Sequence, residues 1–340
     1  MTWLINGGCG FVGSNLADAL LCAGEEVTIV DNLSRAGSAE NLRWLRSGYK
    51  SEFEFQDMDT RDKDRLAAVI KSLQPSVVAH LAGQVSMVAS LENPRNDFEI
   101  NAIGTYNALD AVRAHSPGSI FLFSSTNKVY GGLEYLKHEE TETRYILPDY
   151  PNGLDEKLQL DGQSPYGCSK LAADQYVRDY HRTYDIKTVV FRHSSMYGSR
   201  QFATFDQGWV GWFCQMAKSM SDPSAEAFTI SGDGKQVRDL LHATDLIEVY
   251  RLAVRNIDKA AGQIYNIGGG MSNSLSLLEL FSQLEELTGH PVRYTKLPAR
   301  FGDQKVFVAD NSKAAREIGW SPKQDKVEGL KQMLKWTDTL

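Results

Sequence analysis

The chain has 340 residues, a length that suits one large domain with a smaller lobe. Hydrophobic residues make up 42% of it and charged residues 23%, which is enough apolar material for a buried core. The formal net charge of -7 argues against nucleic acid or an anionic membrane surface as the main partner. An acidic chain can still bind an anionic ligand through a few arginines and helix N-termini.

The cysteines and the N-terminal residues indicate the compartment. Cys9, Cys22, Cys168 and Cys214 form no C-x-x-C pair and no metal-ligand spacing, so we expect reduced thiols and no metal site. The first residues lack the basic region and the apolar run of a signal peptide. No stretch of 18 uninterrupted apolar residues occurs, so no membrane span is predicted. We therefore expect a cytoplasmic protein.

Short apolar strands alternate with amphipathic helices over roughly the first 190 residues. We predict strands at 2–6, 26–30, 53–56, 76–80, 119–123 and 188–192. We predict helices at 11–23, 63–73, 96–114 and 164–184. Continuous apolar strands separated by helices are typical of a parallel sheet that is covered on both faces. The expected fold class is therefore α/β, with a Rossmann-type doubly wound parallel sheet.

Two regions depart from this alternation. Residues 131–163 form a polar insert that contains Pro and Gly, and connections this long usually cover a binding site or lack order. After residue 198, strands at 227–230 and 263–267 mix with helices at 208–220, 276–287 and 327–336. We interpret residues 1–197 as the Rossmann domain. Residues 198–340 are then mainly a smaller substrate-binding lobe, partly interleaved with that domain, which caps the carboxyl edge of the sheet.

The first predicted strand leads into a glycine-rich turn. Gly7, Gly10 and Gly13 have the spacing G-x-x-G-x-x-G, and the predicted helix begins within it at Phe11 and Val12. Glycines permit a tight turn and let backbone N–H groups approach a pyrophosphate, to which the helix N-terminus adds partial positive charge. A turn of this kind can be purely structural, but its place between a strand and a helix is the one that dinucleotide binding requires.

An acidic residue ends the second predicted strand. Asp31 follows Gly13 by 18 residues. A carboxylate there can bind the ribose hydroxyls of adenosine and repels a 2'-phosphate, so the position favours NAD over NADP. Arg35 leaves NADP open as an alternative, because an arginine can accept a 2'-phosphate.

A tyrosine and a lysine form a Y-x-x-x-K pair in the helix predicted from Ser164, with Pro165 at its first position. Tyr166 and Lys170 are four residues apart and share one face of that helix. A nearby ammonium and a positive nicotinamide ring lower the pKa of a phenol, so Tyr166 can act as a general base. Thr126 ends the fifth strand, at the sheet edge where ligands bind in open α/β folds, and can hydrogen-bond the reacting hydroxyl.

With these residues in place, the chain resembles the extended short-chain dehydrogenase family of nucleotide-sugar epimerases and dehydratases over nearly its whole length. Leu-Ala-Gly at 81–83, Asn-Ala-Ile-Gly-Thr at 101–105, Gly-Lys-Gln-Val-Arg-Asp at 234–239 and Pro-Ala-Arg-Phe-Gly-Asp at 298–303 extend the resemblance. It implies Thr126, Tyr166 and Lys170 as catalytic residues and NAD as the cofactor.

The resemblance also implies two sets of binding residues. The implied cofactor contacts are Gly7, Gly10, Phe11, Val12, Gly13, Asp31, Asn32, Ser34, Arg35, Asp57, Met58, Leu81, Ala82, Gly83, Asn101, Ser124, Tyr166, Lys170 and His193. The implied substrate contacts are Gln84, Thr126, Asn127, Ser194, Ser195, Arg200, Gln201, Gln236, Arg238 and Arg300. Arg238 and Arg300 are the expected ligands of the nucleotide diphosphate, because arginines form charge-assisted bonds to phosphate oxygens.

Further segments resemble those family members that invert C2 of a CDP-linked hexose. These are 125–131, 140–145, 192–198, 200–204 and 206–213, although many relatives carry Asn where this chain has Ser195. The resemblance implies a CDP-hexose substrate and transient NAD-dependent oxidation to a 2-ketone, followed by return of the hydride to its other face. It also implies a homodimer or homotetramer.

Three alternatives stay open. Related 4,6-dehydratases carry Asp-Glu after the threonine as acid and base; Asn127 and Lys128 stand there in this chain and cannot do carboxylate chemistry. A UDP- or CDP-sugar 4-epimerase shares all the machinery, and residue chemistry does not separate it. A non-catalytic NAD-sensing module is disfavoured by the intact Thr126, Tyr166 and Lys170.

Overall fold

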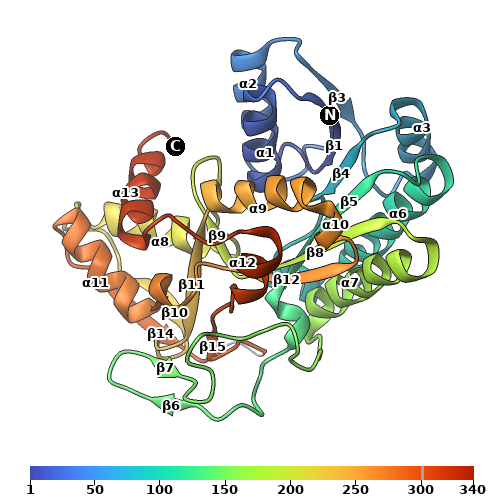
Figure 1. Cartoon of the computed structure of the whole chain (residues 1–340). Helices are drawn as coiled ribbons and strands as arrows, with labels where there is room; N and C mark the ends of the chain where they lie inside the picture. The colour runs from blue at the N-terminus through green and yellow to red at the C-terminus, as the bar shows by residue number, and fades with distance from the viewer. Residues whose placement is uncertain (300–301) are drawn as a thin grey trace.

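A seven-stranded parallel sheet forms the centre of the molecule (Figure 1). In this computed structural model, which describes residues 1–299 and 302–340, the strand order is β12-β8-β5-β4-β1-β2-β3. The strands are β1 (Thr2–Asn6), β2 (Glu26–Asp31), β3 (Phe53–Asp57), β4 (Val77–His80), β5 (Ile120–Thr126), β8 (Lys187–His193) and β12 (Gln263–Ile267). All neighbours pair in parallel, so the carboxyl ends of the strands meet along one edge. The predicted α/β fold is confirmed.

Helices cover both faces of this sheet. One apolar core lies under α1 (Phe11–Cys22), α2 (Ser38–Tyr49), α9 (Ala243–Arg255), α10 (Ile257–Ala260) and α12 (Ser312–Ile318). The opposite core lies under α3 (Lys63–Leu73), α6 (Gly104–His115) and α7 (Ser164–Tyr184). Successive side chains of a strand point to opposite faces, and accordingly Trp3 and Ile5 belong to the first core and Leu4 to the second.

The helix predicted at 96–114 consists of three consecutive segments. These are α5 (Pro94–Phe98), the π-helical turn η1 (Glu99–Ile103) and α6, and a short helix α4 (Met87–Glu92) precedes them. The wide turn contains Asn101, whose side chain accepts from the backbone N–H of Gln84 at 2.9 Å and donates to Ser169 Oγ at 3.1 Å. Asn101 thereby joins the segment that follows β4 to helix α7. A π-turn within a helix often accompanies a functional site.

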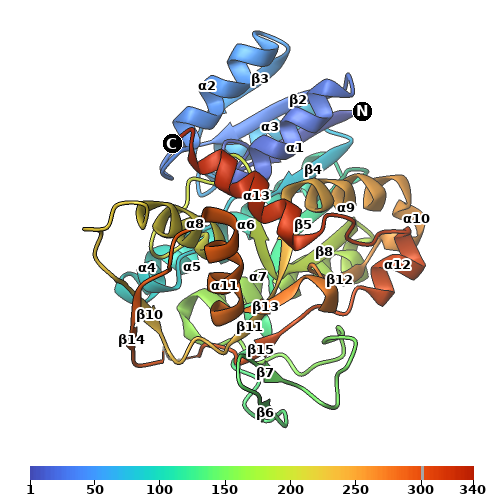
Figure 2. The same cartoon turned by 90° about the vertical axis from the view of Figure 1, so that its left-hand side faces the viewer.

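A smaller lobe lies beside the carboxyl edge of the sheet (Figures 1 and 2). Its core packs under α8 (Trp209–Ser219), α11 (Leu277–Thr288) and α13 (Lys326–Thr337). Its strands are β9 (Ser195–Tyr197), β10 (Phe228–Ser231), β11 (Val237–His242), β13 (Ser274–Ser276), β14 (Tyr294–Leu297) and β15 (Val306–Phe307). Two short 3-10 helices are η2 (Asn127–Tyr130) and η3 (Met271–Asn273). Within the described residues, no helix has the length and apolar character that crossing a membrane requires.

The C-terminal part of the chain returns to the large sheet. The strand predicted at 263–267 for the lobe is β12, which pairs with β8 from Gln263 opposite Val189 to Ile267 opposite His193. Helices α9 and α12, for which no prediction was made, cover the same sheet. Periodicity could not assign β12, because the partner of a strand is not encoded in the strand's own residues.

The insert at 131–163 packs against the smaller lobe. It carries the hairpin β6 (Glu139–Glu140) and β7 (Tyr145–Ile146), seen at the bottom of Figure 1. Tyr145 N–H donates to the carbonyl oxygen of Lys235 at 3.0 Å, and Leu154 N–H donates to that of Val308 at 2.7 Å. Arg144 forms an ion pair with Glu279. The insert thus packs as a fourth apolar core against the lobe, and none of its residues lines either cavity described below.

Candidate active site

A cavity of about 390 Å³ lies beside the glycine-rich turn, at the carboxyl ends of the strands. Most of the predicted cofactor contacts gather in its wall: Gly7, Gly10, Phe11, Val12, Gly13, Asp31, Asn32, Ser34, Arg35, Met58, Leu81, Ala82, Gly83 and Ser124. Asp57, Asn101, Lys170 and His193 are not among the described residues that line it. We refer to this space as the dinucleotide cavity, since its shape and wall match what a dinucleotide requires.

The glycines of the turn are required by close backbone approach. Gly7 has φ of +79°, and a Cβ there would lie 2.6 Å from the backbone nitrogen of Ala82. A Cβ on Gly13 would overlap the carbonyl oxygen of Gly7. Gly10 N–H donates to that same oxygen at 3.1 Å and closes the turn before α1. The turn therefore leaves backbone space at the helix N-terminus for a pyrophosphate.

Asp31 lies at the end of β2 in the wall of this cavity. Its carboxylate accepts from the N–H of Cys9 at 2.9 Å and of Leu33 at 2.8 Å. Burial raises the pKa of Asp31, and these two N–H groups act against the increase. Arg35 lines the same cavity; burial lowers its pKa and the negative charge of Asp206 opposes that effect. Asp31 is thus held in place with acceptor capacity left for a ribose.

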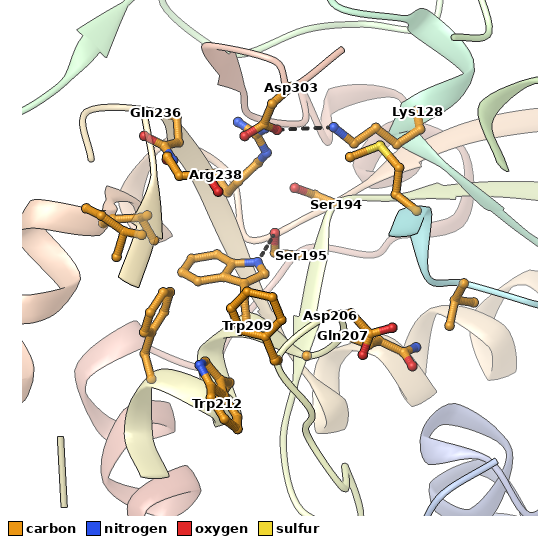
Figure 3. A pocket seen from close by; sticks show the side chains of 18 of the residues that line it. Lys128, Ser194, Ser195, Asp206, Gln207, Trp209, Trp212, Gln236, Arg238 and Asp303 are labelled. Carbon is orange, nitrogen blue, oxygen red and sulfur yellow. Dashed lines mark hydrogen bonds and ion pairs between the residues drawn. The ribbon is translucent and has the colours of Figure 1, made fainter. Parts of the chain in front are cut away.

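A second cavity of about 310 Å³ lies between the sheet edge and the lobe (Figure 3). The predicted residues in its wall are Asn127, Tyr166, Ser194, Ser195, Gln236 and Arg238, and Lys128, which was not predicted as a contact, lines it as well. Val85 and Gln207 line both cavities, so the two spaces adjoin. We refer to the second space as the sugar-nucleotide cavity, after the substrate that the resemblance in the sequence implies.

Tyr166 lines the sugar-nucleotide cavity and is brought together with Thr126, which is not among the described residues that line either cavity. The phenol of Tyr166 and the hydroxyl of Thr126 are hydrogen-bonded. Burial raises the pKa of Tyr166 to about 12, Thr126 acts to lower it, and Asp97 adds to the increase. Helix α7 begins at Ser164, whose hydroxyl accepts from the N–H of Gly167 at 3.3 Å, so the first turn presents Tyr166 to the cavity.

Lys170, four residues after Tyr166 on α7, is held by residues of strand β5. Its ammonium donates to the carbonyl oxygen of Ser124 at 2.6 Å and lies 4.3 Å from the ring centroid of Phe123. Burial lowers the pKa of Lys170 to about 8, against the negative charges of Asp174 and Asp97. Burial raises the pKa of Tyr166, and the lowering expected from Lys170 together with a nicotinamide ring stays a prediction.

A buried ion pair fixes the strands and the helix that carry these groups. Asp174 on α7 forms two hydrogen bonds, of 2.8 and 2.9 Å, with the guanidinium of Arg192 on β8. Asp174 also accepts from Ser125 Oγ at 2.8 Å, and Arg192 donates to the hydroxyl of Tyr130 at 2.9 Å. Both charged side chains are 1% exposed or less. The ends of β5 and β8 are thereby tied to the helix that holds Tyr166.

Charged groups meet at the lobe end of the sugar-nucleotide cavity (Figure 3). Asp303 pairs with Lys128 at 3.3 Å and with Arg238 at 2.7 Å. Asn127 donates to Gln304 Oε1 at 2.9 Å. Two cations around one carboxylate give this end a positive balance, which suits a diphosphate.

Several predicted substrate contacts lie elsewhere. Gln84, Arg200 and Gln201 line the dinucleotide cavity, and Gln84 is held by Asn101 and Asp97. Arg300 lies outside the described residues. Among the predicted cofactor contacts, His193 is buried against Ser125 and Tyr250, and burial lowers its pKa to about 3.

The sequence reasoning missed much of the aromatic wall. Phe205, Trp209, Trp212 and Phe213 line the sugar-nucleotide cavity, and Trp209 Nε1 donates to Ser195 Oγ at 3.1 Å (Figure 3). The spacing of Trp209, Trp212 and Phe213 is that of one helix face, which could have indicated them. Asp303 also lines this cavity, but it lies on a loop that is distant in the sequence, and no helical spacing indicates it. No cluster of three or more potential metal ligands occurs within residues 1–299 and 302–340.

This fold and site define a class of dinucleotide-binding enzymes in which the tyrosine of a Tyr/Lys pair lines a second ligand cavity. Residues 4–333 match the GDP-mannose 4,6 dehydratase family, and the chain belongs to that family, so the resemblance to extended short-chain dehydrogenases is confirmed. The CDP-paratose 2-epimerase of Salmonella typhi is 54% identical over 340 residues, which is all of both chains.

Solved structures agree with this assignment. The UDP-glucose 4-epimerase of Thermotoga maritima with UDP-glucose has a TM-score of 0.84 and 29% identity, covering 100% of this chain and 99% of that one. The UDP-glucuronic acid 4-epimerase of Bacillus cereus, in complex with UDP-glucuronic acid and NAD, has a TM-score of 0.83 and 27% identity over 100% and 99%. The chain is therefore similar throughout to nucleotide-sugar enzymes.

Proposed function

We propose that this protein is an NAD-dependent 2-epimerase that interconverts CDP-paratose and CDP-tyvelose. The observation that carries the proposal is the 54% identity, without truncation of either chain, to an enzyme named as a CDP-paratose 2-epimerase. The site supports the same reaction, because Tyr166 lines a cavity that adjoins the one beside the glycine-rich turn.

The dinucleotide cavity fits NAD. Glycines that exclude a Cβ, a helix N-terminus and the fixed carboxylate of Asp31 are what a pyrophosphate and a ribose require. When bound, NAD would supply a hydride acceptor and donor for C2 of the sugar. The carboxylate of Asp31 disfavours NADP, although Arg35 in the same wall could meet a 2'-phosphate.

The chain's own groups would move the proton. Tyr166 would take the proton of the C2 hydroxyl and return it after the 2-ketone has rotated to present its other face, with Thr126 as its hydrogen-bond partner. Lys170, four residues after Tyr166 on α7, would supply positive charge that stabilises the phenolate. Paratose lacks a hydroxyl at C3, so direct oxidation at C2 is the short route to inversion.

Relatives catalyse two other reactions, and the residues of the site argue against the first of them, 4,6-dehydration. Asn127 and Lys128 line the sugar-nucleotide cavity at the place where a 4,6-dehydratase needs a carboxylic acid and a base. Neither side chain can protonate a leaving hydroxyl as a carboxylic acid does. A 4-epimerase would use the same Tyr166 and Thr126, so only the product identifies the carbon that is inverted.

The test is a product assay with three substrates. CDP-paratose should yield CDP-tyvelose, while UDP-galactose and dTDP-glucose should remain unchanged. Conversion of UDP-galactose to UDP-glucose, with no turnover of CDP-paratose, would contradict the proposal. The same reaction in deuterated water should leave C2 without deuterium, because the hydride returns without exchange; stoichiometric deuterium at C2 would rule out hydride return.

We also propose a homodimer or homotetramer that works in the cytoplasm. Large apolar side chains are exposed on the helices from α4 to α7, namely Leu91, Phe98, Ile103, Tyr106 and Tyr176. Tyr106 and Tyr176 are in contact with each other, and exposed apolar side chains that gather on one surface often mark a protein interface. All four cysteines are free thiols, which suits a reducing compartment. Analytical ultracentrifugation should give a mass of at least two chains.

A further inference from the structure

A strap of residues 199–207 contributes to the walls of both cavities. Arg200, Gln201, Phe202 and Gln207 line the dinucleotide cavity, and Phe205, Asp206 and Gln207 line the sugar-nucleotide cavity. A dinucleotide bound in the first cavity would therefore contact both the glycine-rich turn and this strap.

The first half of the strap is fastened to the large domain. Asn15 on α1 donates to the carbonyl oxygen of Ser199 at 3.0 Å, and Asn41 on α2 donates to that of Arg200 at 3.2 Å. The ring of Phe202 packs on Gly37, where any Cβ would overlap it. These contacts hold the strap close to the helices that follow β1 and β2.

Arg200 joins the strap to helices from two different units. Its guanidinium lies 4.5 Å from the ring centroid of Trp44 on α2 and 4.1 Å from that of Trp336 on α13. The indole N–H of Trp336 donates to the carbonyl oxygen of Gln201 at 3.1 Å. Helices α2 and the end of α13 lie near one another in Figure 2, which is what permits this double stack. Arg200 itself has φ of +69°, a conformation that side chains rarely adopt.

The second half of the strap is fastened near the junction of the cavities. Asp206 is hydrogen-bonded to Ser86, which caps α4. Thr204 N–H donates to the carbonyl oxygen of Gln207 at 2.9 Å, and Gln207 N–H donates back to that of Thr204 at 3.1 Å. The carboxamide oxygen of Gln207 is buried without a partner among the described residues. The strap is thus tied at both ends, with an unsatisfied polar group beside the place where the two ligands would meet.

We propose that Arg200 is a positioning residue that latches this strap over the dinucleotide cavity and so slows the release of NAD. The inference rests on the proposed function for the identity of the cofactor. A cation stacked between two indoles interacts with both rings. Replacement of Arg200 by alanine therefore removes its contacts with Trp44 and Trp336 together. An epimerase that regenerates its cofactor in every cycle gains from slow release, because the same NAD serves successive turnovers.

The test measures the dissociation rate of NAD. Protein loaded with NAD is mixed with ethanol and an excess of alcohol dehydrogenase, which reduces each released NAD and reports it by absorbance. Arg200→Ala should release NAD at least about tenfold faster than the wild type, and Arg200→Lys should be intermediate. Trp44→Leu should resemble Arg200→Ala. Arg43→Ala is the matched control, because Arg43 is an exposed neighbour on α2 that pairs with Glu40.

Two further readouts separate a latch from a loss of folding. Thermal unfolding without NAD should stay within a few degrees of the wild type for Arg200→Ala, and millimolar NAD should restore its turnover. An unchanged release rate in folded Arg200→Ala and Trp44→Leu overturns the latch, as does equal acceleration by Arg43→Ala. A wild type that binds no NAD overturns the proposed function as well, whereas a wild type that epimerises without any effect of Arg200→Ala overturns the latch alone.

Discussion

Lys170 donates a 2.6 Å hydrogen bond to the carbonyl oxygen of Ser124, at the end of the strand that also carries Thr126. The ammonium is therefore held by the backbone of β5, the strand whose last residue, Thr126, is hydrogen-bonded to Tyr166. The charge state of Lys170 depends on pH within an accessible range, because burial lowers its pKa to about 8.

This pKa predicts a decline in turnover at alkaline pH. Above about pH 8 the side chain of Lys170 loses its proton, so the positive charge that stabilises the phenolate of Tyr166 disappears. Lys170→Arg should keep part of the activity and shift the decline to higher pH, since a guanidinium stays charged. Lys170→Met should be slower at every pH and lack the decline. Profiles of kcat against pH for the three proteins are the measurement, and an unchanged alkaline limb in Lys170→Met would contradict the role.

Removal of the phenol hydroxyl should abolish most of the chemistry. Tyr166→Phe should lower kcat by about 10²–10⁴-fold, the usual contribution of a positioned general base. NAD binding should persist, since Tyr166 does not line the dinucleotide cavity. Tyr184→Phe is the control on the same helix, because that side chain is exposed and lines neither cavity. Turnover of Tyr166→Phe at the wild-type rate would remove Tyr166 from the mechanism.

Arg238 should contribute to substrate affinity rather than to rate. Arg238→Ala should raise KM for CDP-paratose by roughly 10–100-fold with little change in kcat, because a charge-assisted bond to the diphosphate forms in the ground state and the transition state alike. Steady-state kinetics measure both constants. Arg316→Ala, at an exposed surface site, should leave both unchanged. A fall in kcat at constant KM would place Arg238 in the chemical step instead.

The ion pair of Asp174 and Arg192 should matter for stability. Asp174→Ala leaves a buried guanidinium without its carboxylate, and we expect a loss of about 3–5 kcal/mol in the free energy of unfolding. Asp110→Ala removes one partner of an exposed pair with Arg113 and should cost less than about 1 kcal/mol. Urea unfolding measured by circular dichroism compares the two. Equal effects of the two substitutions would show that burial of the pair adds nothing.

His80 should make stability fall in mild acid. It is fully buried between Asn6 and Thr105, and burial lowers its pKa to about 3. A pKa below the unfolded value of 6.5 means that the unfolded chain binds more protons, so stability is present above pH 6.5 and is lost as pH falls below it. The loss from this residue at pH 5.5 should be on the order of 1 kcal/mol.

The measurement for His80 is a difference between proteins, because other groups also titrate in this range. Urea unfolding at pH 7.5 and 5.5 should show a smaller drop for His80→Gln than for the wild type. His290→Gln should keep the full drop. If His80→Gln loses as much stability on acidification as the wild type, the histidine is not held neutral by burial.

Local patterns in the sequence were enough to predict the residue types from which the site is built. The glycines at 7, 10 and 13, the acidic end of β2 and the pairing of Tyr166 with Lys170 act through spacing within one or two elements. Because backbone geometry fixes the positions of residues at such spacings, these motifs can be recognised without knowledge of tertiary contacts. Gln84, Arg200 and Gln201 were predicted as substrate contacts but line the dinucleotide cavity. They lie on connecting segments whose course depends on packing.

The sequence by itself determined the α/β class, the dinucleotide turn and the Tyr/Lys pair, since each depends on residues that are neighbours along the chain. Only the tertiary structure decided that β12 completes the large sheet, that the insert packs on the lobe and that Asp303 meets Lys128 and Arg238. It also decided the environment of Lys170 and Tyr166. These features depend on contacts and burial between distant segments, which no local pattern specifies.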